Sequence, residues 1–365
     1  MKRLTIAIAN FNGGKNLQRA IESCRKIQIP LEDYEILIAD NCSTDNSINI
    51  INELSKEFPN IVLIENKENV GRIQNWNVCL DNAKGKFLIF LFINDMINER
   101  NNIHEILEIL DKNEDISIGF SSFLKKEIDN SYIKKSFSDK IIECSSKLFA
   151  QECLNRGLLP FGPIQIIIYR MDDIRKNQNN FLASMPINAD EIFTYREACR
   201  REKILFNPNP QITWDLTQDR FHKQMKIESE FKEHSEALEI IKREIGFEVN
   251  YGLVSTYRAI NLLKFSIGNL RNEGNKQAIS HLVSKMKENK SFFNTDKILF
   301  NTFINKLKNS EKDADDILYS EIINKCINES KNKFYRLCNL PIKLHIILQT
   351  DLVAYAKKYN RSDFL

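Results

Sequence analysis

Two of the polar groups that could do chemistry follow directly after apolar runs. Asp40 comes after Tyr34–Ala39, and the pair Asn94-Asp95 comes after the apolar run Lys86–Phe92. A side chain that follows a buried parallel strand lies at the carboxyl edge of the sheet, where open α/β sheets bind ligands. Asp40 could hold a nucleobase or ribose, and it could equally cap a helix. Asn94 and Asp95 could hold a divalent cation, although Asn-Asp also starts turns.

Two further groups lie later in the chain. Asp190-Glu191 opens a segment of helical pattern, where acids interact favourably with the helix dipole and where a general base could equally sit. Arg220 and His222 alternate around Phe221, so an extended backbone would point both to one side. Such a pair could grip a diphosphate, or it could be part of a solvated basic stretch.

The elements that must position these groups follow from hydrophobic periodicity. Strands are expected at 4–9, 34–39, 61–65, 86–92, 116–124, 164–169, 204–206 and 212–214. Helices are expected at 16–26, from the cap at 41–45 to 58, and at 72–83, 103–112 and 187–201. Residues 125–140 are expected to form a loop. Strands and helices alternate over the first hundred residues, which predicts an α/β fold with a mostly parallel central sheet flanked by helices.

Composition limits the class of protein. The chain has 365 residues, 42% of them hydrophobic, which is enough for a substantial core. A net charge of +3 does not indicate nucleic-acid binding. The eight cysteines form no CxxC pair, so a structural zinc site is not expected. No apolar run approaches the length of a transmembrane helix, and we expect a cytoplasmic protein with reduced thiols.

The character of the sequence changes near residue 225, where Lys/Glu-rich segments with helical spacing replace the strand patterns. We therefore expect two domains, residues 1–225 and residues 226–365, the second helical. Ile342–Tyr359 mixes apolar and basic residues. It could attach to the inner face of the cytoplasmic membrane, but a packed helical subdomain or a homodimer contact is the favoured interpretation.

In their order, these groups resemble the family-2 glycosyltransferases with the GT-A fold. The opening TIAIANFNGG resembles the family's first strand and turn, and EILIADNCSTDNS resembles its acidic segment, with Asp40 and Asn41 in place of the acidic pair. The stretch NVGRIQNWNVCLDNAKGKFLIFLFIND resembles the segment that ends in the D-x-D-D edge. The segments FGPIQIIIYR, ADEIFTYREACR and DRFHKQ resemble later motifs, so the resemblance covers about residues 2 to 225.

The resemblance implies an inverting transfer of a sugar from a nucleotide-diphosphate donor, with a UDP-sugar favoured, to a hydroxyl of a growing surface glycan on a lipid-linked or oligosaccharide acceptor. It implies that Asp190 or Glu191 is the catalytic base, and that Asn94 and Asp95 bind Mg²⁺ or Mn²⁺. The implied donor-binding residues are Asn10, Phe11, Asn12, Asp40, Asn41, Asn69, Gly71, Arg72, Asn77, Phe92, Ile93, Asn94, Arg220 and His222.

The sequence departs from the family pattern at the metal edge. Phe92 stands where the first acid would be, and Asn94 stands where an Asp usually binds metal. Either Asp95 takes over with help from Asn94, which is the favoured outcome, or cationic side chains replace the metal, or turnover is lost. A nucleotide-sugar-binding scaffold protein is therefore the alternative function. A nucleotidyltransferase ranks last, because FNGGK is only a faint version of its glycine-rich loop.

Overall fold

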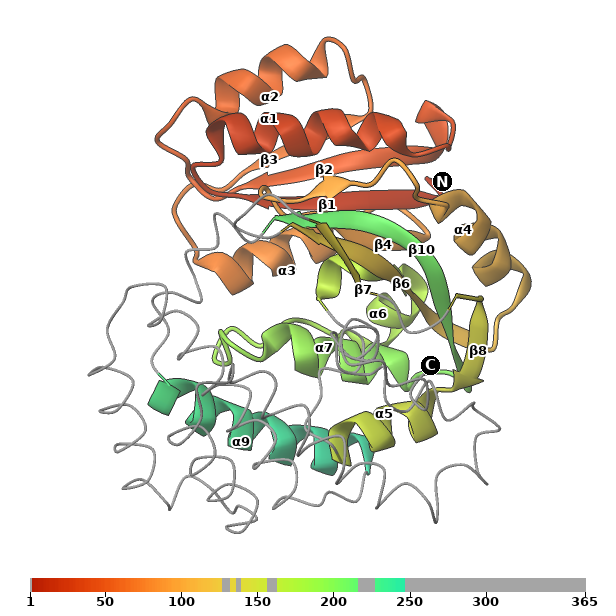
Figure 1. Cartoon of the computed structure of the whole chain (residues 1–365). Coiled ribbons are helices and arrows are strands. Elements are labelled where there is room, and N and C mark those ends of the chain that lie inside the picture. The colour runs from red at the N-terminus through yellow and green to blue at the C-terminus, as the bar shows by residue number, and fades with distance from the viewer. Residues whose placement is uncertain (1, 127–131, 136–138, 156–162, 216–226, 247–365) are drawn as a thin grey trace, which may run out of the picture. The chain divides into compact units, whose positions relative to one another are not determined.

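The computed structural model of the chain describes residues 2–126, 132–135, 139–155, 163–215 and 227–246 (Figure 1). The chain divides into two compact units, one made of Met1–Lys147 and Phe161–Arg220 and the other of Leu148–Pro160 and Phe221–Leu365. All the predicted site residues except His222 belong to the first unit.

The first hundred residues form the predicted alternation. The strands are β1 (Leu4–Asn10), β2 (Tyr34–Asp40), β3 (Ile61–Glu65) and β4 (Phe87–Phe90), and the helices are α1 (Gly14–Ser23), α2 (Ser47–Ser55), α3 (Arg72–Asn82) and α4 (Ile103–Lys112). β1 is parallel to both β2 and β4, and β2 is parallel to β3. The carboxyl ends of these strands therefore meet at one edge of the sheet.

The other elements in the described residues are the later strands of a mixed sheet and the later helices. They are β5 (Met96–Ile97), β6 (Ile116–Lys126), β7 (Tyr132–Lys135), β8 (Ile142–Ser145), α5 (Ser146–Asn155), β9 (Ile167–Arg170), α6 (Met171–Asn177), α7 (Ala189–Ala198), β10 (Lys203–Asp215) and α9 (Ile227–Ile245). In the described residues the strand order is β3-β2-β1-β4-β9-β6-β10-β5, with β7 beside β6 and β8 beside β10. The α/β class is confirmed, but β9 is antiparallel to both of its neighbours, so the later half of the sheet is mixed.

Two predictions about individual elements were wrong. Residues 125–140 do not form only a loop, because β6 runs to Lys126 and pairs antiparallel with β7. The two short strands expected at 204–206 and 212–214 are one strand, β10, whose pairing with β6 shifts register on both sides of Pro210. Proline cannot donate to a ladder and is accommodated at such irregularities, which is why the pattern looked interrupted.

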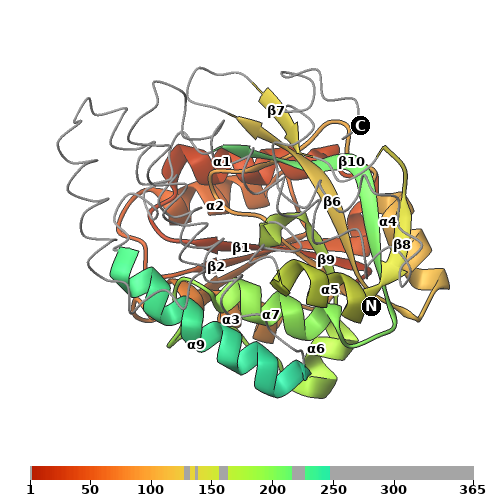
Figure 2. The ribbon, with the colours of Figure 1, turned by 60° about the horizontal axis from the view of Figure 1, so that its bottom comes forward.

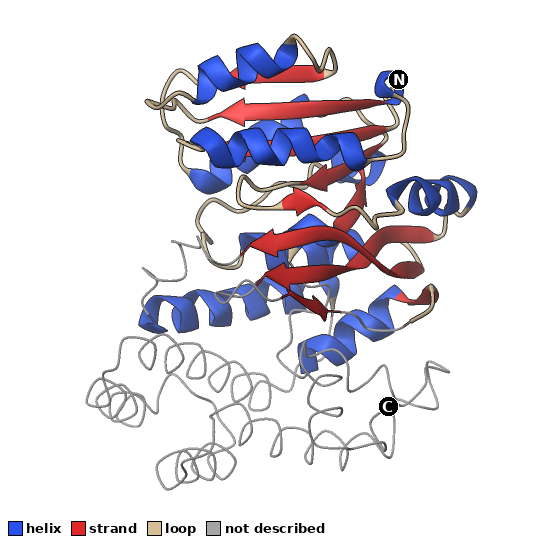
Figure 3. Cartoon of the chain, turned by 45° about the horizontal axis from the view of Figure 1, so that its top comes forward, coloured by secondary structure: helices blue, strands red, loops and turns tan. Residues whose placement is uncertain are grey.

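Helices cover both faces of the sheet. α1 and α2 lie on one face, and α3, α6 and α7 lie on the other, as two turned views also show (Figures 2 and 3). Leu17, Ala20 and Ile21 of α1 are fully buried at a spacing of three and four residues, as expected for an amphipathic helix on a sheet. The four residues of β4 are also fully buried, which explains their continuous apolar run.

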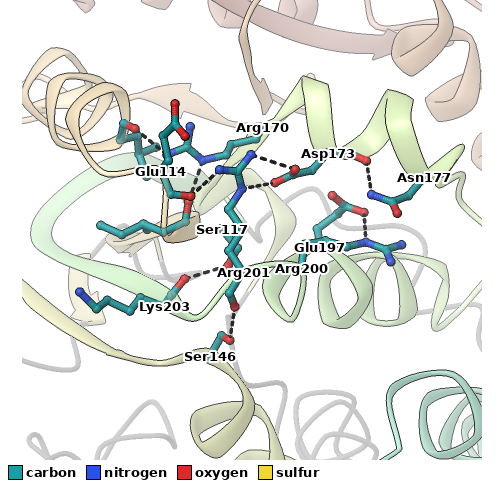
Figure 4. A network of polar contacts seen from close by, with 12 residues as sticks. Glu114, Ser117, Ser146, Arg170, Asp173, Asn177, Glu197, Arg200, Arg201 and Lys203 are labelled. Carbon is teal, nitrogen blue, oxygen red and sulfur yellow. Dashed lines mark hydrogen bonds and ion pairs between the residues drawn. The ribbon is translucent and has the colours of Figure 1, made fainter.

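A polar network fixes the far end of α7 (Figure 4). Arg201, just after α7, holds Asp173 of α6 with two hydrogen bonds of 2.6 and 2.9 Å. Arg170 donates to the carbonyls of Leu110, of Asn113 at 2.8 Å and of Ile116 at 2.7 Å. Bidentate arginine–carboxylate pairs restrict geometry as well as adding energy. The network therefore anchors α7, whose first turn carries Asp190 and Glu191.

Gly85, in the turn before β4, predicts a large effect on stability. A Cβ at this position would lie 2.4 Å from the backbone nitrogen of Thr5 and 2.7 Å from the carbonyl carbon of Leu4. Both atoms belong to the backbone of β1, so the chain can relieve the clash only by separating β1 from β4. We expect Gly85→Ala to lower the free energy of unfolding by about 2 to 3 kcal/mol. Urea unfolding measures this, and Lys84→Ala is the neighbouring control, expected to stay near wild type.

Candidate active site

The carboxylate of Asp40 is buried at the end of β2, where it is 2% exposed. It accepts hydrogen bonds from Asn10 Nδ2 at 2.6 Å, from the Ser43 backbone nitrogen at 2.9 Å and from Ser43 Oγ at 2.6 Å. Both carboxylate oxygens therefore serve to close the turn after β2 and to tie it to the end of β1. Any bond to a nucleotide would be made in addition to these.

The turn after β1 presents an aromatic ring at the same edge. Phe11 is 46% exposed, although large apolar side chains are usually covered. Its neighbour Asn12 is held by two hydrogen bonds. Asn12 Oδ1 accepts a hydrogen bond from the backbone nitrogen of Thr44 at 2.8 Å, and the Asn12 backbone nitrogen donates to Ser43 Oγ at 2.9 Å. An exposed ring on a turn held by hydrogen bonds is suited to stacking on a nucleobase.

A set of asparagines links the ends of β2 and β3 to α3. Asn41 Nδ2 donates to Asn69 Oδ1 at 2.8 Å, and Asn66 Nδ2 donates to Asn75 Oδ1 at 2.8 Å. Asn75 Nδ2 in turn donates to the carbonyl of Ala39 at 2.9 Å. Asn66 and Asn75 were not predicted from sequence. The sequence signal for them was the density of asparagine in residues 66–77, at four of twelve positions.

Gly71 directly precedes α3 as its N-cap. Its φ is 85°, in the left-handed region that favours glycine. Its backbone nitrogen donates to Asn69 Oδ1 at 3.0 Å. Asn77, on the same helix, uses its carboxamide for the backbone of Phe181, with Phe181 N donating to Oδ1 at 2.8 Å and Nδ2 donating to the Phe181 carbonyl at 3.0 Å. Asn77 therefore positions the segment before α7.

Arg72, at the start of α3, stands between the aromatic residues and the first turn of α7. Its guanidinium lies 4.9 Å from the ring centroid of Trp76, and it donates to the Pro186 carbonyl. Trp76 stacks on Phe92 with centroids 5.3 Å apart. Phe92, which replaces the expected acid, is therefore part of an aromatic stack, and both it and Ile93 are partly exposed.

Asp190 and Glu191 are adjacent in sequence but differ in their surroundings. Glu191 is 4% exposed and accepts a hydrogen bond from Asn188 at 2.9 Å, whereas Asp190 is partly exposed. Desolvation raises the pKa of Asp190 to about 6, the charge of Glu191 adds to the rise, and Arg72 opposes it. A base with a pKa near the working pH is the most effective proton acceptor, so Asp190 is the better candidate.

Arg72 predicts a change in the pH dependence of activity. Asp190 interacts with the charges of Glu191 and Arg72, and its charge also acts on Tyr169. Removing the arginine in Arg72→Met removes a cation that favours ionised Asp190, so the pKa of Asp190 should rise above about 6. We expect the acidic limb of kcat/KM to move to higher pH by roughly half a unit.

The control for Arg72→Met is Arg25→Met. Arg25 is also an arginine over an aromatic ring, 4.3 Å from the centroid of Phe58, and it pairs with Glu57 at 2.5 Å. It lies in the same unit, and none of its contacts within the described residues is with Asp190. An unchanged profile in Arg72→Met, or an equal change in Arg25→Met, would show that Arg72 does not act on the base.

Asn94 and Asp95 are both engaged by protein groups. Asn94 Oδ1 accepts from Asn16 Nδ2 at 3.1 Å. Asp95, 2% exposed, accepts from Gln165 Nε2 at 2.8 Å and from the backbone nitrogen of Asp215 at 3.3 Å. In the part of the chain that the structure describes, no group of three His, Cys, Asp or Glu could hold a metal ion. This donor set does not fit the Mg²⁺ or Mn²⁺ that the sequence led us to expect.

Helix α3 brings three of these groups together. Asn75 donates to the carbonyls of Asn10 and Ala39 at the ends of β1 and β2, Trp76 stacks on Phe92 beside the Asp95 turn, and the charge of Arg72 acts on Asp190. Residues three and four apart share one side of a helix, so α3 can serve all three at once. Arg220 and His222 lie outside the described residues. Gln165 and Asp215 were missed because nothing local in the sequence marks them as neighbours of Asp95.

Comparison with known proteins agrees with this arrangement. Residues 5–177 match the family described as glycosyl transferase family 2. A poly(ribitol-phosphate) beta-glucosyltransferase of Bacillus spizizenii is 24% identical over 204 residues, which are 55% of this chain and 30% of that protein. The dolichyl N-acetyl-alpha-D-glucosaminyl phosphate 3-beta-D-2,3-diacetamido-2,3-dideoxy-beta-D-glucuronosyltransferase of Methanococcus voltae is 25% identical over 271 residues, covering 72% of this chain and 77% of that one. The chain thus spans less than a third of the Bacillus relative.

Solved structures share the fold. Residues 1–349 of TarS from Staphylococcus aureus, in complex with UDP-GlcNAc, superpose with a TM-score of 0.56 at 14% identity, covering 91% of this chain and 93% of that one. A mannosyltransferase from Pyrobaculum calidifontis, in complex with GDP-Man and Mn²⁺, gives a TM-score of 0.50 at 11% identity, with 91% and 88% covered. The GT-A fold is confirmed by these likenesses. Within the described residues, none of the helices has the length and apolar character needed to span a membrane.

Proposed function

We propose that this chain, whose residues 5–177 match glycosyl transferase family 2, is an inverting glycosyltransferase. It moves a sugar from a nucleotide-diphosphate donor, preferably a UDP-sugar, to a hydroxyl of a growing cell-surface glycan. The observation that carries the proposal is Asp190, a partly exposed acid in the first turn of the anchored helix α7. Desolvation raises the pKa of Asp190 to about 6.

The reaction is a single displacement. Asp190 takes the proton from the acceptor hydroxyl as its oxygen forms a bond to the anomeric carbon. The bond from that carbon to the diphosphate oxygen breaks on the opposite face, and the nucleoside diphosphate leaves, so the configuration inverts. Holding both substrates in line supplies much of the rate enhancement, and this requires fixed surroundings for the base.

The donor residues are assigned by the same proposal. Phe11 stacks on the base, and the loop built by Asn10, Asn12, Asp40 and Asn41 surrounds the nucleoside. The start of α3 follows, with Asn69, Gly71 and Arg72 beside the sugar or diphosphate. Arg220 and His222, which lie outside the described residues, are proposed to contact the diphosphate, where cationic donors offset the charge of the leaving group.

The acceptor is proposed from chemistry that two relatives share. The Bacillus relative is named for poly(ribitol-phosphate) and the Methanococcus relative for a dolichyl phosphate-linked sugar. We therefore favour a phosphate-containing glycan or a lipid-linked sugar as acceptor over a free sugar. Residues 226–365 are proposed as a separate helical domain for acceptor, membrane-surface or dimer contacts, and the protein is proposed to work in the cytoplasm or at the inner face of its membrane.

The test is transfer itself. The full-length enzyme is incubated with UDP-glucose or UDP-GlcNAc and a ribitol-phosphate oligomer or polyprenyl-phosphate sugar, and released UDP is measured. We expect acceptor-dependent release that Asp190→Ala abolishes, and an inverted anomeric configuration in the product by NMR. UDP-sugar binding by calorimetry with no transfer to any acceptor would instead support the scaffold function. The replacement of the expected acids by Phe92 and Asn94 is the observation that favours this alternative.

A further inference from the structure

The polar edge after β4 is closed by its own hydrogen bonds. Asn94 Oδ1 is taken by Asn16 of α1 at 3.1 Å, and Asp95 accepts from Gln165 and from the backbone nitrogen of Asp215. A divalent cation binds carboxylate and amide oxygens through their lone pairs, so it would have to compete with these donors for them. Since Asp95 is 2% exposed, an ion could reach it only after the surrounding bonds had opened.

The charge at this edge is already balanced by the protein. Asp215, also 2% exposed, lies 3.2 Å from Lys126 Nζ and 3.8 Å from an Arg19 nitrogen. Two carboxylates, Asp95 and Asp215, are therefore accompanied by two side-chain cations. Buried charges persist in proteins when they are paired, as Asp215 is with both cations, and cations already present beside the two carboxylates lower the electrostatic gain from a further ion.

Phe92 removes the remaining acid that a metal could use. In place of a carboxylate it contributes a ring that stacks on Trp76 at 5.3 Å. The described residues of this edge thus offer a divalent ion one buried carboxylate that already accepts two hydrogen bonds, and one neutral amide that accepts another. These residues instead connect α1, the β4 exit turn and the ends of β6 and β10.

We propose that this enzyme binds the diphosphate of its donor without a divalent cation, and that Asn94 and Asp95 form a structural latch rather than a metal site. The inference rests on the proposed function, because it concerns the same donor. Side-chain cations such as Arg72 offset the leaving-group charge in the place of an ion, a role that positive side chains can fill.

Two calorimetric titrations of the full-length enzyme test the latch. UDP is titrated in EDTA and again in Mn²⁺, and Mn²⁺ is titrated into the enzyme with and without UDP. We expect Kd values for UDP that agree within about twofold in the two buffers. We also expect the wild-type enzyme and Asp95→Asn to give the same result in the Mn²⁺ titration.

The outcomes are distinct. UDP affinity at least tenfold higher in Mn²⁺, or one Mn²⁺ per chain whose binding Asp95→Asn abolishes, would overturn the latch. If Asp95→Asn still binds Mn²⁺ and its affinity for UDP is unchanged, the ion binds at a site other than Asp95, and this result supports the latch. If UDP bound in neither buffer, the choice of UDP in the proposed function would fail, and the Mn²⁺ titration alone would still decide between latch and metal site.

Discussion

Asp190→Asn should reduce kcat by about a thousandfold or more while leaving the affinity for UDP within a few-fold of wild type. The substitution keeps the size of the side chain but removes its ability to take the acceptor proton, and a positioned base contributes roughly 10² to 10⁴ in rate. Initial rates of UDP release at saturating donor and acceptor measure the effect. Calorimetry with UDP measures the binding that should persist.

Glu197→Gln is the matched control for this substitution. Glu197 lies seven residues after Asp190 on α7, about 10 Å along the helix, and burial raises its pKa to about 6 as well. Its carboxylate accepts from Asn179 at 2.7 Å and from Arg200 at 3.4 Å. Near-normal turnover in Glu197→Gln beside an inactive Asp190→Asn would separate the base from a general requirement for acids on α7. Equal losses would contradict the assignment.

The stability of Asp190→Asn gives a second check. The folded protein binds a proton at Asp190 more tightly than the unfolded chain does, because burial raises the pKa from 3.8 to about 6. The contribution of Asp190 to stability is therefore greatest below about pH 3.8 and is lost as the pH rises through 6. At pH 7.5 the asparagine variant should melt at or above the wild-type temperature. A lower melting temperature would mean that lost activity reflects unfolding.

The sequence predicted what depends on local pattern. The first four strands and four helices were located because buried parallel strands read as apolar runs and surface helices repeat every three to four residues. The extent of α4, Ile103–Lys112, was predicted to the residue. The order of polar groups at strand ends was also visible, since a parallel sheet gathers those ends at one edge.

What the sequence could not show depends on contacts between distant residues. β9 and β10 pair with strands formed much earlier in the chain, and the two-residue β5 is a strand only because β10 lies beside it. Gln165 lies 70 residues after the Asp95 that it contacts, and the backbone of Asp215 lies 120 residues after it. The residue types at Asn94 and Asp95 were informative, but their partners decide whether an ion can reach them.

Asp40→Ala should lower the free energy of unfolding by about 3 to 4 kcal/mol and abolish detectable UDP binding. The carboxylate accepts three hydrogen bonds, and truncation would leave the Ser43 nitrogen without its acceptor and the fully buried Asn10 amide with only the longer bond of 3.2 Å to Ser43 Oγ. Each stranded buried donor costs about 1 to 3 kcal/mol. The turns after β1 and β2, which hold Phe11 and Asn41, would lose their shared anchor. Urea unfolding and UDP calorimetry measure the two effects.

Ser43→Ala separates the structural role of Asp40 from its proposed contact with the nucleotide. The variant removes the Ser43 hydroxyl, which donates to Asp40 at 2.6 Å and accepts from the Asn12 nitrogen at 2.9 Å, but keeps the carboxylate and the backbone bond from Ser43 N at 2.9 Å. We expect a loss of about 1 kcal/mol in stability, with UDP still bound. If Ser43→Ala weakened UDP binding as much as Asp40→Ala, the carboxylate would act only by shaping the loop. If Asp40→Ala still bound UDP at wild-type affinity, Asp40 would have no part in holding the donor.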